Sequence, residues 1–347
     1  MKMRVGVTGG TGYIGSHTVV ELMSAGHEVV IVDNFSNSEP GVLDALEQIT
    51  GRRPVFVKAD LACPDQAREF FSAAGPLDAI IHFAAFLSVE ESVRVPLHYF
   101  RNNLFSLVHV LQGMQSHSIP HMVFSSSCTV YGQPDTLPIS EDAPLQPAWS
   151  PYGQTKQMSE DILRSCTASG GVRAIALRYF NPIGAHPSAL IGELPYGLPH
   201  HLVPFIVQTA SGQRDYLRIF GYDYNTLDGT PVRDYIHVTD LARAHVQALE
   251  RMAGGQGREW EVYNLGVGHG FSVLDMVKAF EEATGLKVPY QLFPRRAGDV
   301  EKVWADNRRA REVLGWIPEY GLHDMMRTAW DWEQHLRGSG WYERNKR

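Results

Sequence analysis

A glycine-rich turn close to residue 1 is the feature that most constrains how this chain can fold. The segment VGVTGGTGYIG covers residues 5–15, with a short apolar run before the glycines and a helical pattern after them. Gly9, Gly12 and Gly15 fit G-x-x-G-x-x-G, and the overlapping glycines at 10, 12 and 15 fit G-x-G-x-x-G. Glycine allows the tight turn and lets the backbone approach a pyrophosphate, which the free N–H groups of the next helix can bind. The segment therefore predicts a dinucleotide-binding βα unit.

Apolar runs and helical patterns alternate through the first half of the chain. The expected strands are residues 4–8, 28–33, 55–60, 79–84, 121–127 and 173–178, and the clearest expected helices are residues 16–25 and 104–116. This alternation predicts an α/β fold of the Rossmann type, a doubly wound parallel sheet covered by helices on both faces. Ligands of such sheets bind at the carboxyl ends of the strands, so the residues that end these runs are the candidates for a site.

The pattern changes after residue 181, where glycine and proline crowd an irregular stretch. A strand at residues 262–265 and a helix at residues 273–280 follow, the helix preceded by Ser272 and Asp275 at the spacing of a variant capping box. We expect an NAD-binding domain at residues 1–180 and a smaller substrate-binding α/β domain at residues 181–347. Segments around residues 233–250 are expected to pack back on the first domain.

Asp33 ends the second expected strand, about 20 residues after the last glycine of the turn. A carboxylate at this place accepts hydrogen bonds from the adenosine ribose hydroxyls and repels a 2′-phosphate, so the cofactor is expected to be NAD and not NADP. The alternative is a structural turn followed by a solvated aspartate.

Two further features follow in the order that catalysis would require. Ser127 closes the expected strand at residues 121–127, and Tyr152 and Lys156 form a Y-x-x-x-K pair on one face of a helix that Ser150 can cap. Tyrosine has a pKa near 10, so a base active at neutral pH needs a fall of about 3 units, or roughly 4 kcal/mol. A lysine ammonium about 4 Å away supplies about that much. Surface residues at chance spacing are the alternative.

Composition excludes several classes of function. The formal net charge of −7 argues against a nucleic-acid-binding surface. Three widely spaced cysteines without a C-x-x-C pair indicate neither a zinc site nor a disulfide framework, so no metal is expected. There is no apolar run long enough to span a membrane and no signal-peptide pattern, which leads us to expect a cytoplasmic protein without a membrane partner.

Several longer motifs resemble those of the extended short-chain dehydrogenases that act on nucleotide sugars, and among these the UDP-galactose (UDP-glucose) 4-epimerases. They are TGGTGYIGSH (8–17), VDN (32–34), FSSSCTVYG (124–132), SPYGQTK (150–156), RYFNPIGAHPS (178–188), VRDYIHVTDLA (232–242), YNLG (263–266) and PRRAGDV (294–300). The resemblance implies an NAD-dependent epimerase, commonly a homodimer, in which Tyr152 takes the proton of the sugar 4-hydroxyl, Ser127 hydrogen-bonds that hydroxyl, and Lys156 holds the nicotinamide ribose.

The same resemblance implies further contacts. Besides the three glycines and the catalytic residues, those to NAD are Tyr13, Ile14, Asp33, Asn34, Asn37, Ser38, Asp60, Leu61, Phe83, Ala84, Asn102 and Phe180. Those to the UDP-sugar are Asn181, His201, Leu202, Phe220, Arg233, Arg296, Asp299 and Val303.

Three positions depart from the family pattern. Leu87 stands where many members have a lysine near the cofactor, and His201 stands where an asparagine often contacts the substrate. Val303 occupies the position beside the sugar 2-substituent, where relatives have a tyrosine or a small residue. The small valine predicts some activity on N-acetylated UDP-sugars.

Two competing functions are considered. A 4,6-dehydratase or decarboxylase needs a carboxylate just before V-Y-G, and Cys128 and Thr129 stand there instead. A non-catalytic NAD-sensing protein would be free to lose Tyr152 or Lys156, and both are present.

Overall fold

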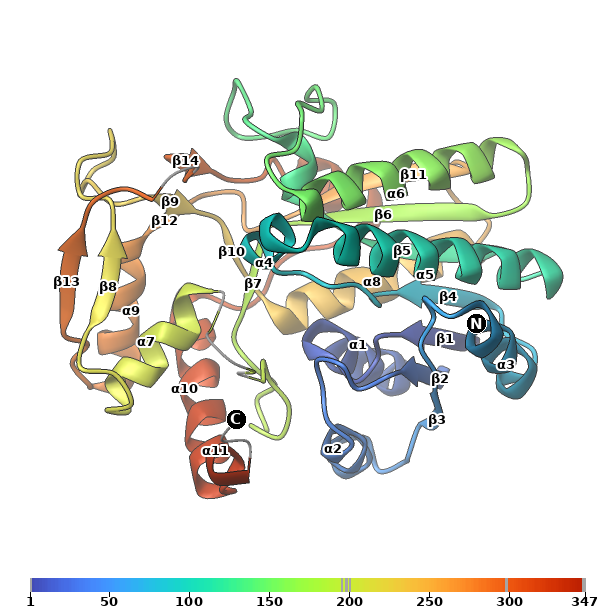
Figure 1. Cartoon of the computed structure of the whole chain (residues 1–347), viewed down its shortest axis with the longest axis horizontal. Coiled ribbons are helices and arrows are strands. Elements are labelled where there is room, and N and C mark those ends of the chain that lie inside the picture. Colours follow the sequence, from blue (N-terminus) through green and yellow to red (C-terminus); the bar gives the residue numbers. More distant parts are fainter. Residues whose placement is uncertain (1, 195, 197–198, 200, 297–298, 345–347) are drawn as a thin grey trace.

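The computed structural model describes residues 2–194, 196, 199, 201–296 and 299–344. Seven parallel strands form the large sheet, in the order β11-β6-β5-β4-β1-β2-β3 (Figure 1). They are β1 (Arg4–Thr8), β2 (Glu28–Asp33), β3 (Val55–Lys58), β4 (Ala79–His82), β5 (His121–Ser127), β6 (Arg173–Tyr179) and β11 (Trp260–Leu265). Because all seven strands run in the same direction, their carboxyl ends meet at one edge, where the candidate site residues were expected.

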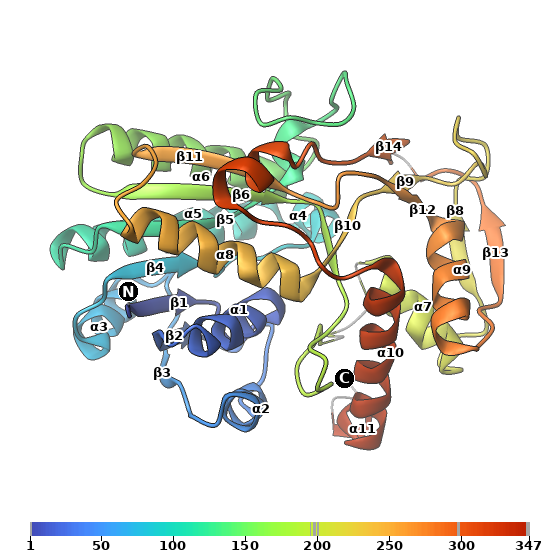
Figure 2. The same ribbon diagram turned by 180° about the vertical axis from the view of Figure 1, so that it is seen from behind.

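Helices cover both faces of this sheet. They are α1 (Tyr13–Ser24), α2 (Gly41–Thr50), α3 (Pro64–Ala74), α4 (Val89–Arg94), α5 (Pro96–Ser116), α6 (Pro151–Ala168) and α8 (Val238–Ala253), with a 3₁₀ turn, η1, at Cys128–Tyr131. Helices α1 and α8 pack side by side on one face, and α3, α5 and α6 cover the other (Figures 1 and 2). The predicted doubly wound α/β fold is confirmed.

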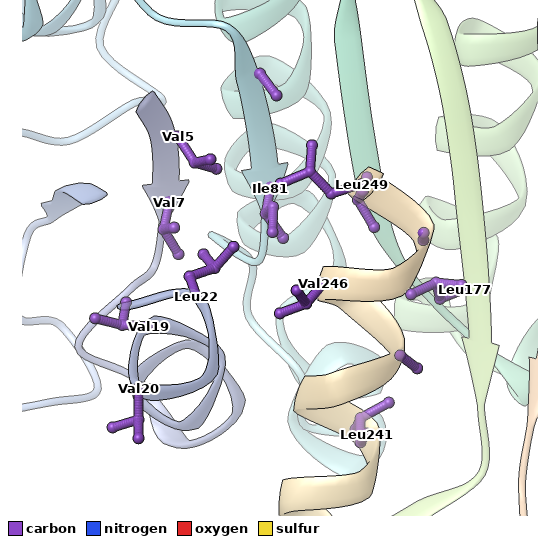
Figure 3. Packing of buried hydrophobic residues seen from close by; sticks show 14 of the residues in the cluster. Val5, Val7, Val19, Val20, Leu22, Ile81, Leu177, Leu241, Val246 and Leu249 are labelled. Atoms are coloured by element: carbon purple, nitrogen blue, oxygen red, sulfur yellow. The ribbon is translucent and has the colours of Figure 1, made fainter. Parts of the chain in front are cut away.

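Strand side chains alternate between two hydrophobic cores, as the period of a β-strand requires. Val7 and Ile81 pack toward α1 and α8, where Val19 and Val246 meet them (Figure 3). The neighbouring Ile80 points to the opposite face, into the cluster formed with α3 and α5. Burial on both faces explains why these strands are continuous apolar runs in the sequence.

A smaller group of elements lies beside the carboxyl edge of the sheet. It contains α7 (Leu202–Ala210), β8 (Leu217–Phe220), α9 (Val273–Thr284), β13 (Tyr290–Phe293), α10 (Leu322–Gly338) and α11 (Trp341–Arg344). Helices α7, α9 and α10 and strand β8 share a third hydrophobic cluster, and α11 packs on α10 in a smaller one. Short strands connect the two parts: β7 (Asn181–Ile183) pairs with β10 (Tyr235–His237), and β9 (Val232–Arg233) pairs with β12 (Phe271–Ser272) and β14 (Lys302–Val303). A short π-helical turn, η2, covers Ala310–Leu314.

Two details of the second half differ from or extend the sequence expectation. The strand expected at residues 262–265 exists as β11, but it pairs with β6 at the edge of the large sheet and does not belong to the smaller group. Helix α8 does pack back on α1, and the capping box of Ser272 and Asp275 is present at the start of α9. A division into independent domains at residue 180 stays a prediction.

Within the described ranges, no helix is both long and apolar enough to cross a membrane.

Candidate active site

The glycine turn forms a cradle whose close packing leaves no room for side chains. Gly9 has φ of 67°, and an added Cβ would lie 2.9 Å from the backbone nitrogen of Ala84. A Cβ on Gly15 would lie 2.2 Å from the carbonyl oxygen of Gly9. Gly12 starts α1 without a side-chain cap, so the first N–H groups of the helix, including those of Tyr13, face outward from an uncapped terminus. The turn therefore fits a pyrophosphate group.

Asp33 lies directly beside this turn. One carboxylate oxygen accepts a hydrogen bond from the backbone N–H of Thr11 at 3.2 Å, and the other accepts one from Phe35 at 2.9 Å. The buried Ser38 hydroxyl is hydrogen-bonded to the Thr11 hydroxyl at 2.7 Å and donates to the Asp33 carboxylate at 3.4 Å. The carboxylate is thus fixed at the end of β2, next to the glycine turn, where a ribose can meet it.

The other residues expected to contact NAD occupy the same edge of the sheet. Phe83 and Ala84 directly follow β4, and the Ala84 N–H donates to the Thr8 hydroxyl at the end of β1. Asp60 and the buried Leu61 follow β3, and Asn34 and the exposed Asn37 follow β2. Ile14 is in the first turn of α1, Asn102 is half-buried on α5, and Phe180 is buried after β6.

Ser127 and Tyr152 meet at the end of β5. Ser150 caps α6 by accepting a hydrogen bond from Gly153 at 3.1 Å, which puts Tyr152 in the first turn as expected. The buried Ser127 hydroxyl accepts hydrogen bonds from the N–H and the hydroxyl of Thr129, at 3.2 and 3.0 Å, and as a hydrogen-bonding neighbour it lowers the pKa of Tyr152. A serine and a tyrosine hydroxyl are therefore paired beside the cofactor cradle.

Lys156 lies one turn further along the same helix and is buried. Its ammonium group donates to the carbonyl oxygen of Ser125 at 2.6 Å and lies 5.8 Å from the centre of the Tyr152 ring. Burial lowers the pKa of Lys156 to about 7, although the charge of Glu160 acts in the opposite direction. The lysine is thus oriented by the backbone of the strand that carries Ser127.

The protein alone does not produce the low tyrosine pKa that the sequence reasoning expected. Burial raises the pKa of Tyr152 to about 12, and the hydrogen bond from Ser127 only partly offsets this rise. Desolvation penalises the phenolate more than the serine hydroxyl stabilises it, and the neighbouring Cys128 also raises the pKa of Tyr152. A further positive charge beside the hydroxyl is needed for Tyr152 to act as a base near neutral pH.

A buried ion pair behind the catalytic residues was not anticipated from the sequence. Glu160 and Arg178 bond through two nitrogens of the guanidinium, at 2.9 and 2.5 Å, and Glu160 also accepts a hydrogen bond from Ser126 at 2.6 Å. Arg178 in turn donates to the Tyr131 hydroxyl at 2.9 Å. The network connects α6, β5, β6 and η1, and the only sequence signal for it was the position of Glu160 one turn after Lys156.

The charged residues expected to hold the UDP part form one group. Asp299 bridges two guanidinium groups, that of Arg233 at 3.6 Å and that of Arg296 at 3.0 Å. The Arg296 guanidinium also lies 5.1 Å from the centre of the Phe220 ring at the end of β8. Arg233 acts electrostatically on Cys128, the neighbour of Ser127, so this group lies close to the catalytic residues.

Asn181 and Val303 lie on two of the short strands, β7 and β14. Asn181 is at the start of β7, and its side-chain amide donates to the carbonyl oxygen of Asp234 at 2.8 Å. Val303 is paired with Arg233 across β14 and β9 and packs against the cluster that contains Phe180 and Val130. The expected gate position therefore contacts the same apolar cluster as η1.

His201 and Leu202 stand at the beginning of α7, and Leu87 is exposed before α4. His201 is hydrogen-bonded to Glu193 at 2.8 Å, and the negative charge of Glu193 raises its pKa in spite of burial. A protonated His201 can offer a positive charge that the asparagine of relatives lacks.

Among the residues whose placement is described, no group of three or more potential metal ligands occurs.

Comparison with known proteins agrees with this geometry. Residues 5–266 match the model of the NAD dependent epimerase/dehydratase family. The chain belongs to this family. The resemblance inferred from the sequence motifs is thereby confirmed.

Members of the family cover nearly the whole chain. The UDP-glucose 4-epimerase of Bacillus subtilis is 48% identical over 332 residues, which are 95% of this chain and 97% of that protein. A mouse UDP-glucose 4-epimerase is 45% identical, covering 95% of this chain and 96% of its own.

A solved UDP-glucose-4-epimerase from Stenotrophomonas maltophila, with bound NAD and formylated UDP-arabinopyranose, is 45% identical with a TM-score of 0.93 over 97% of this chain and 99% of its own. The enzyme from Bifidobacterium longum, in complex with NAD+ and UDP, is 42% identical with a TM-score of 0.91 over 96% of this chain and 99% of its own.

Proposed function

We propose that the chain is an NAD-dependent UDP-glucose 4-epimerase, which interconverts UDP-galactose and UDP-glucose through a transient 4-keto sugar. The observation that carries this proposal is the pairing of Ser127 and Tyr152, with the Lys156 ammonium 5.8 Å from the tyrosine ring, in a chain that also has a glycine turn at the end of β1 and two arginines held by Asp299. The glycine turn suits the diphosphate of the cofactor, and the two arginines suit the diphosphate of the substrate.

The residues of the glycine turn and Asp33 fit tightly bound NAD. Added Cβ atoms on Gly9 and Gly15 would clash with neighbouring backbone atoms, so this tight turn before α1 depends on glycine, as a pyrophosphate-binding turn does. The carboxylate of Asp33 stands where it accepts hydrogen bonds from ribose hydroxyls and disfavours a 2′-phosphate. NAD, when bound, accepts hydride from C4 of the sugar and returns it.

Tyr152 moves the proton in this reaction. Its oxygen accepts the proton of the sugar 4-hydroxyl as the carbonyl forms, and the same group returns the proton when the alcohol is restored. Ser127 is hydrogen-bonded to Tyr152 and can share a bond with the reacting oxygen. Lys156 supplies positive charge at 5.8 Å from the ring, and the positive nicotinamide of the oxidised cofactor adds the charge that the protein alone lacks.

Arg233 and Arg296 are the proposed partners of the substrate diphosphate, since guanidinium groups suit phosphate oxygens. Asp299 holds both of them in place. With the diphosphate anchored, the keto sugar can turn and present its opposite face to the hydride, which inverts C4. Asn181, Phe220, Leu202 and His201 complete the proposed contacts.

A coupled assay tests this function directly. The purified protein is given UDP-galactose, and UDP-glucose is detected with an NAD-linked UDP-glucose dehydrogenase after the epimerase has been removed by filtration. We expect conversion in both directions without added NAD. A protein that eliminates water or releases carbon dioxide instead would contradict the proposal, and the residue before Val130 is Thr129, not a carboxylate.

The small side chain of Val303 extends the proposal to N-acetylated sugars. Valine leaves space beside the Phe180 cluster that a tyrosine would fill. We expect slower but measurable epimerisation of UDP-N-acetylglucosamine alongside UDP-glucose.

The proposal includes a homodimer in the cytoplasm. Leu97 and Phe105 lie two helical turns apart on α5 and are 81% and 51% exposed, and Met158 of the adjacent α6 is 45% exposed. A second copy of the chain would cover this apolar face. Light scattering after size-exclusion chromatography tests the dimer, and a monomer at micromolar concentration for the wild type, or a dimer for Leu97→Arg with Phe105→Arg, would contradict this face.

A further inference from the structure

Asp234 is a fully buried carboxylate that follows β9, directly after Arg233. One of its oxygens accepts a hydrogen bond from the backbone N–H of Val267 at 2.8 Å. The other accepts from Gly268 at 3.2 Å and from Ala305 at 3.1 Å. Burial raises the pKa of Asp234 to about 7, and the three N–H groups act against that rise by favouring the carboxylate.

The backbone of the same residue makes three further bonds. Its N–H donates to the carbonyl oxygen of Val303 at 3.1 Å, and its carbonyl oxygen accepts from both the backbone N–H and the side-chain amide of Asn181, at 3.1 and 2.8 Å. Asp234 is thus bonded to β7, to β14 and to the turn after β11, and it is adjacent in sequence to Arg233. Of the proposed substrate contacts, Asn181 and Val303 are hydrogen-bonded to Asp234, and Arg233 precedes it in the chain.

The packing around the carboxylate is close. A Cβ added to Gly266 would lie 2.3 Å from the nearer Asp234 oxygen and 2.9 Å from the Ala305 side chain. The carboxylate therefore fits a confined position, in which a shift of its oxygens must displace the turn after β11 or the end of β14.

We infer that Asp234 is the positioning residue of the UDP-sugar pocket: through its carboxylate and backbone it sets the positions of Arg233, Asn181 and Val303 relative to one another. This inference rests on the proposed function, because those three residues are proposed contacts of the substrate. Asp234 itself touches neither the sugar nor the cofactor in this account. It acts on substrate affinity and sugar range, and it leaves the proton transfer at Tyr152 unchanged.

Asp234→Asn is the most direct perturbation. The amide keeps one acceptor oxygen but presents an NH₂ group to the N–H donors on the other side, so at least one buried donor loses its partner. We expect KM for UDP-galactose to rise about tenfold or more, while kcat stays within about threefold and the bound NAD content is unchanged. The ratio of activity on N-acetylated and plain UDP-sugars should also change, because Val303 is displaced.

Asp240→Asn provides a matched control. Asp240 is also fully buried, and one of its oxygens accepts hydrogen bonds from the backbone N–H groups of Glu319 and Tyr320, both at 3.0 Å. It is not bonded to any of the proposed substrate contacts. Because the amide can keep the oxygen that accepts both N–H groups, we expect this variant to leave KM and the sugar ratio unchanged.

The affinity for UDP, measured by isothermal titration calorimetry, separates this inference from the proposed function. A wild-type protein that does not epimerise UDP-galactose refutes the proposed function, whereas the UDP affinity still tests Asp234. Weaker UDP binding in Asp234→Asn but not in Asp240→Asn supports the inference. Equal UDP binding and KM in Asp234→Asn and the wild type, or an equal rise in both variants, overturns it.

Gly266→Ala decides the question if Asp234→Asn does not fold. Its added methyl group pushes on the carboxylate from the side while all hydrogen-bonding groups remain. A raised KM with normal NAD content supports the inference, and an unchanged KM overturns it.

Discussion

Removing the charge of Lys156 should shift the pH range in which the enzyme works. Burial raises the pKa of Tyr152 to about 12, and the Lys156 ammonium lies 5.8 Å from the ring centre. At that distance and an effective dielectric constant of about 20, the attraction between ammonium and phenolate is about 3 kcal/mol. This corresponds to about 2 pKa units. The coupling is reciprocal, so the ionised tyrosine also raises the pKa of the lysine from its value of about 7.

Lys156→Met should therefore move the acid limb of the kcat profile to higher pH by about 2 units, with roughly 100-fold lower turnover at pH 7. Initial rates of UDP-galactose epimerisation are measured between pH 6 and 10 for the wild type, Lys156→Met and Lys156→Arg. The arginine variant keeps the charge and should keep more of the acid-side activity. Bound NAD is quantified in each preparation to confirm that the cofactor site is filled. An acid limb at the same pH in the methionine variant would refute the electrostatic role of the lysine.

Three further predictions concern stability, cofactor and sugar range. Burial lowers the pKa of His17 and His237 to about 3 and that of His245 to about 4, below the unfolded value of about 6.5, so their contribution to stability is complete above pH 6.5 and is lost as the pH falls. Each of these histidines should lower the free energy of unfolding by about 2 kcal/mol at pH 5. In urea unfolding, the free energy of His245→Gln should therefore fall less between pH 7 and pH 5 than that of the wild type, by about 2 kcal/mol, and an equal fall in both proteins would contradict this. Protein purified without added cofactor should release NAD on denaturation, identified by chromatography, and release of NADP would count against the role of Asp33. Val303→Tyr should abolish activity on UDP-N-acetylglucosamine while retaining activity on UDP-glucose, and equal use of the N-acetylated sugar by both proteins would show that Val303 is not the gate.

The large sheet was predictable from the sequence because its strands are buried on both faces. The bounds of β1, β2 and β5 agree with the apolar runs at residues 4–8, 28–33 and 121–127. Strand β3 ends at Lys58 and not at residue 60, because the chain turns at Asp60, whose carboxylate accepts a hydrogen bond from Ala62. Helix α1 begins at Tyr13, three residues before the expected helix, since Gly12 starts it without a side-chain cap.

Long-range pairing could not be read from local patterns. Strand β11 looks like any short strand in the sequence, and only its pairing with β6, 86 residues earlier, assigns it to the large sheet. The hydrogen bonds of Asp234 could not be predicted either, because its carboxylate accepts them from the distant N–H groups of residues 267, 268 and 305. Ser127, Tyr152 and Lys156 could be predicted from the sequence, because the strand, turn and helix that bring them together follow one another along the chain.

The desolvation of Tyr152 was the contribution to its pKa that the sequence did not reveal. Spacing on a helix gives the proximity of the lysine but not the extent of desolvation around the tyrosine hydroxyl. Burial outweighs the hydrogen bond of Ser127, which assigns a larger share of the activation to the charge of the oxidised cofactor.

The central claim, that Tyr152 moves the proton in an NAD-dependent epimerisation, is tested most directly by single turnovers of Tyr152→Phe with its NAD retained. The variant is mixed with UDP-galactose, and formation of UDP-glucose is followed by chromatography beside the wild type. The account predicts normal NAD content and a normal fold, with conversion slowed at least about 100-fold. Conversion at the wild-type rate would contradict it.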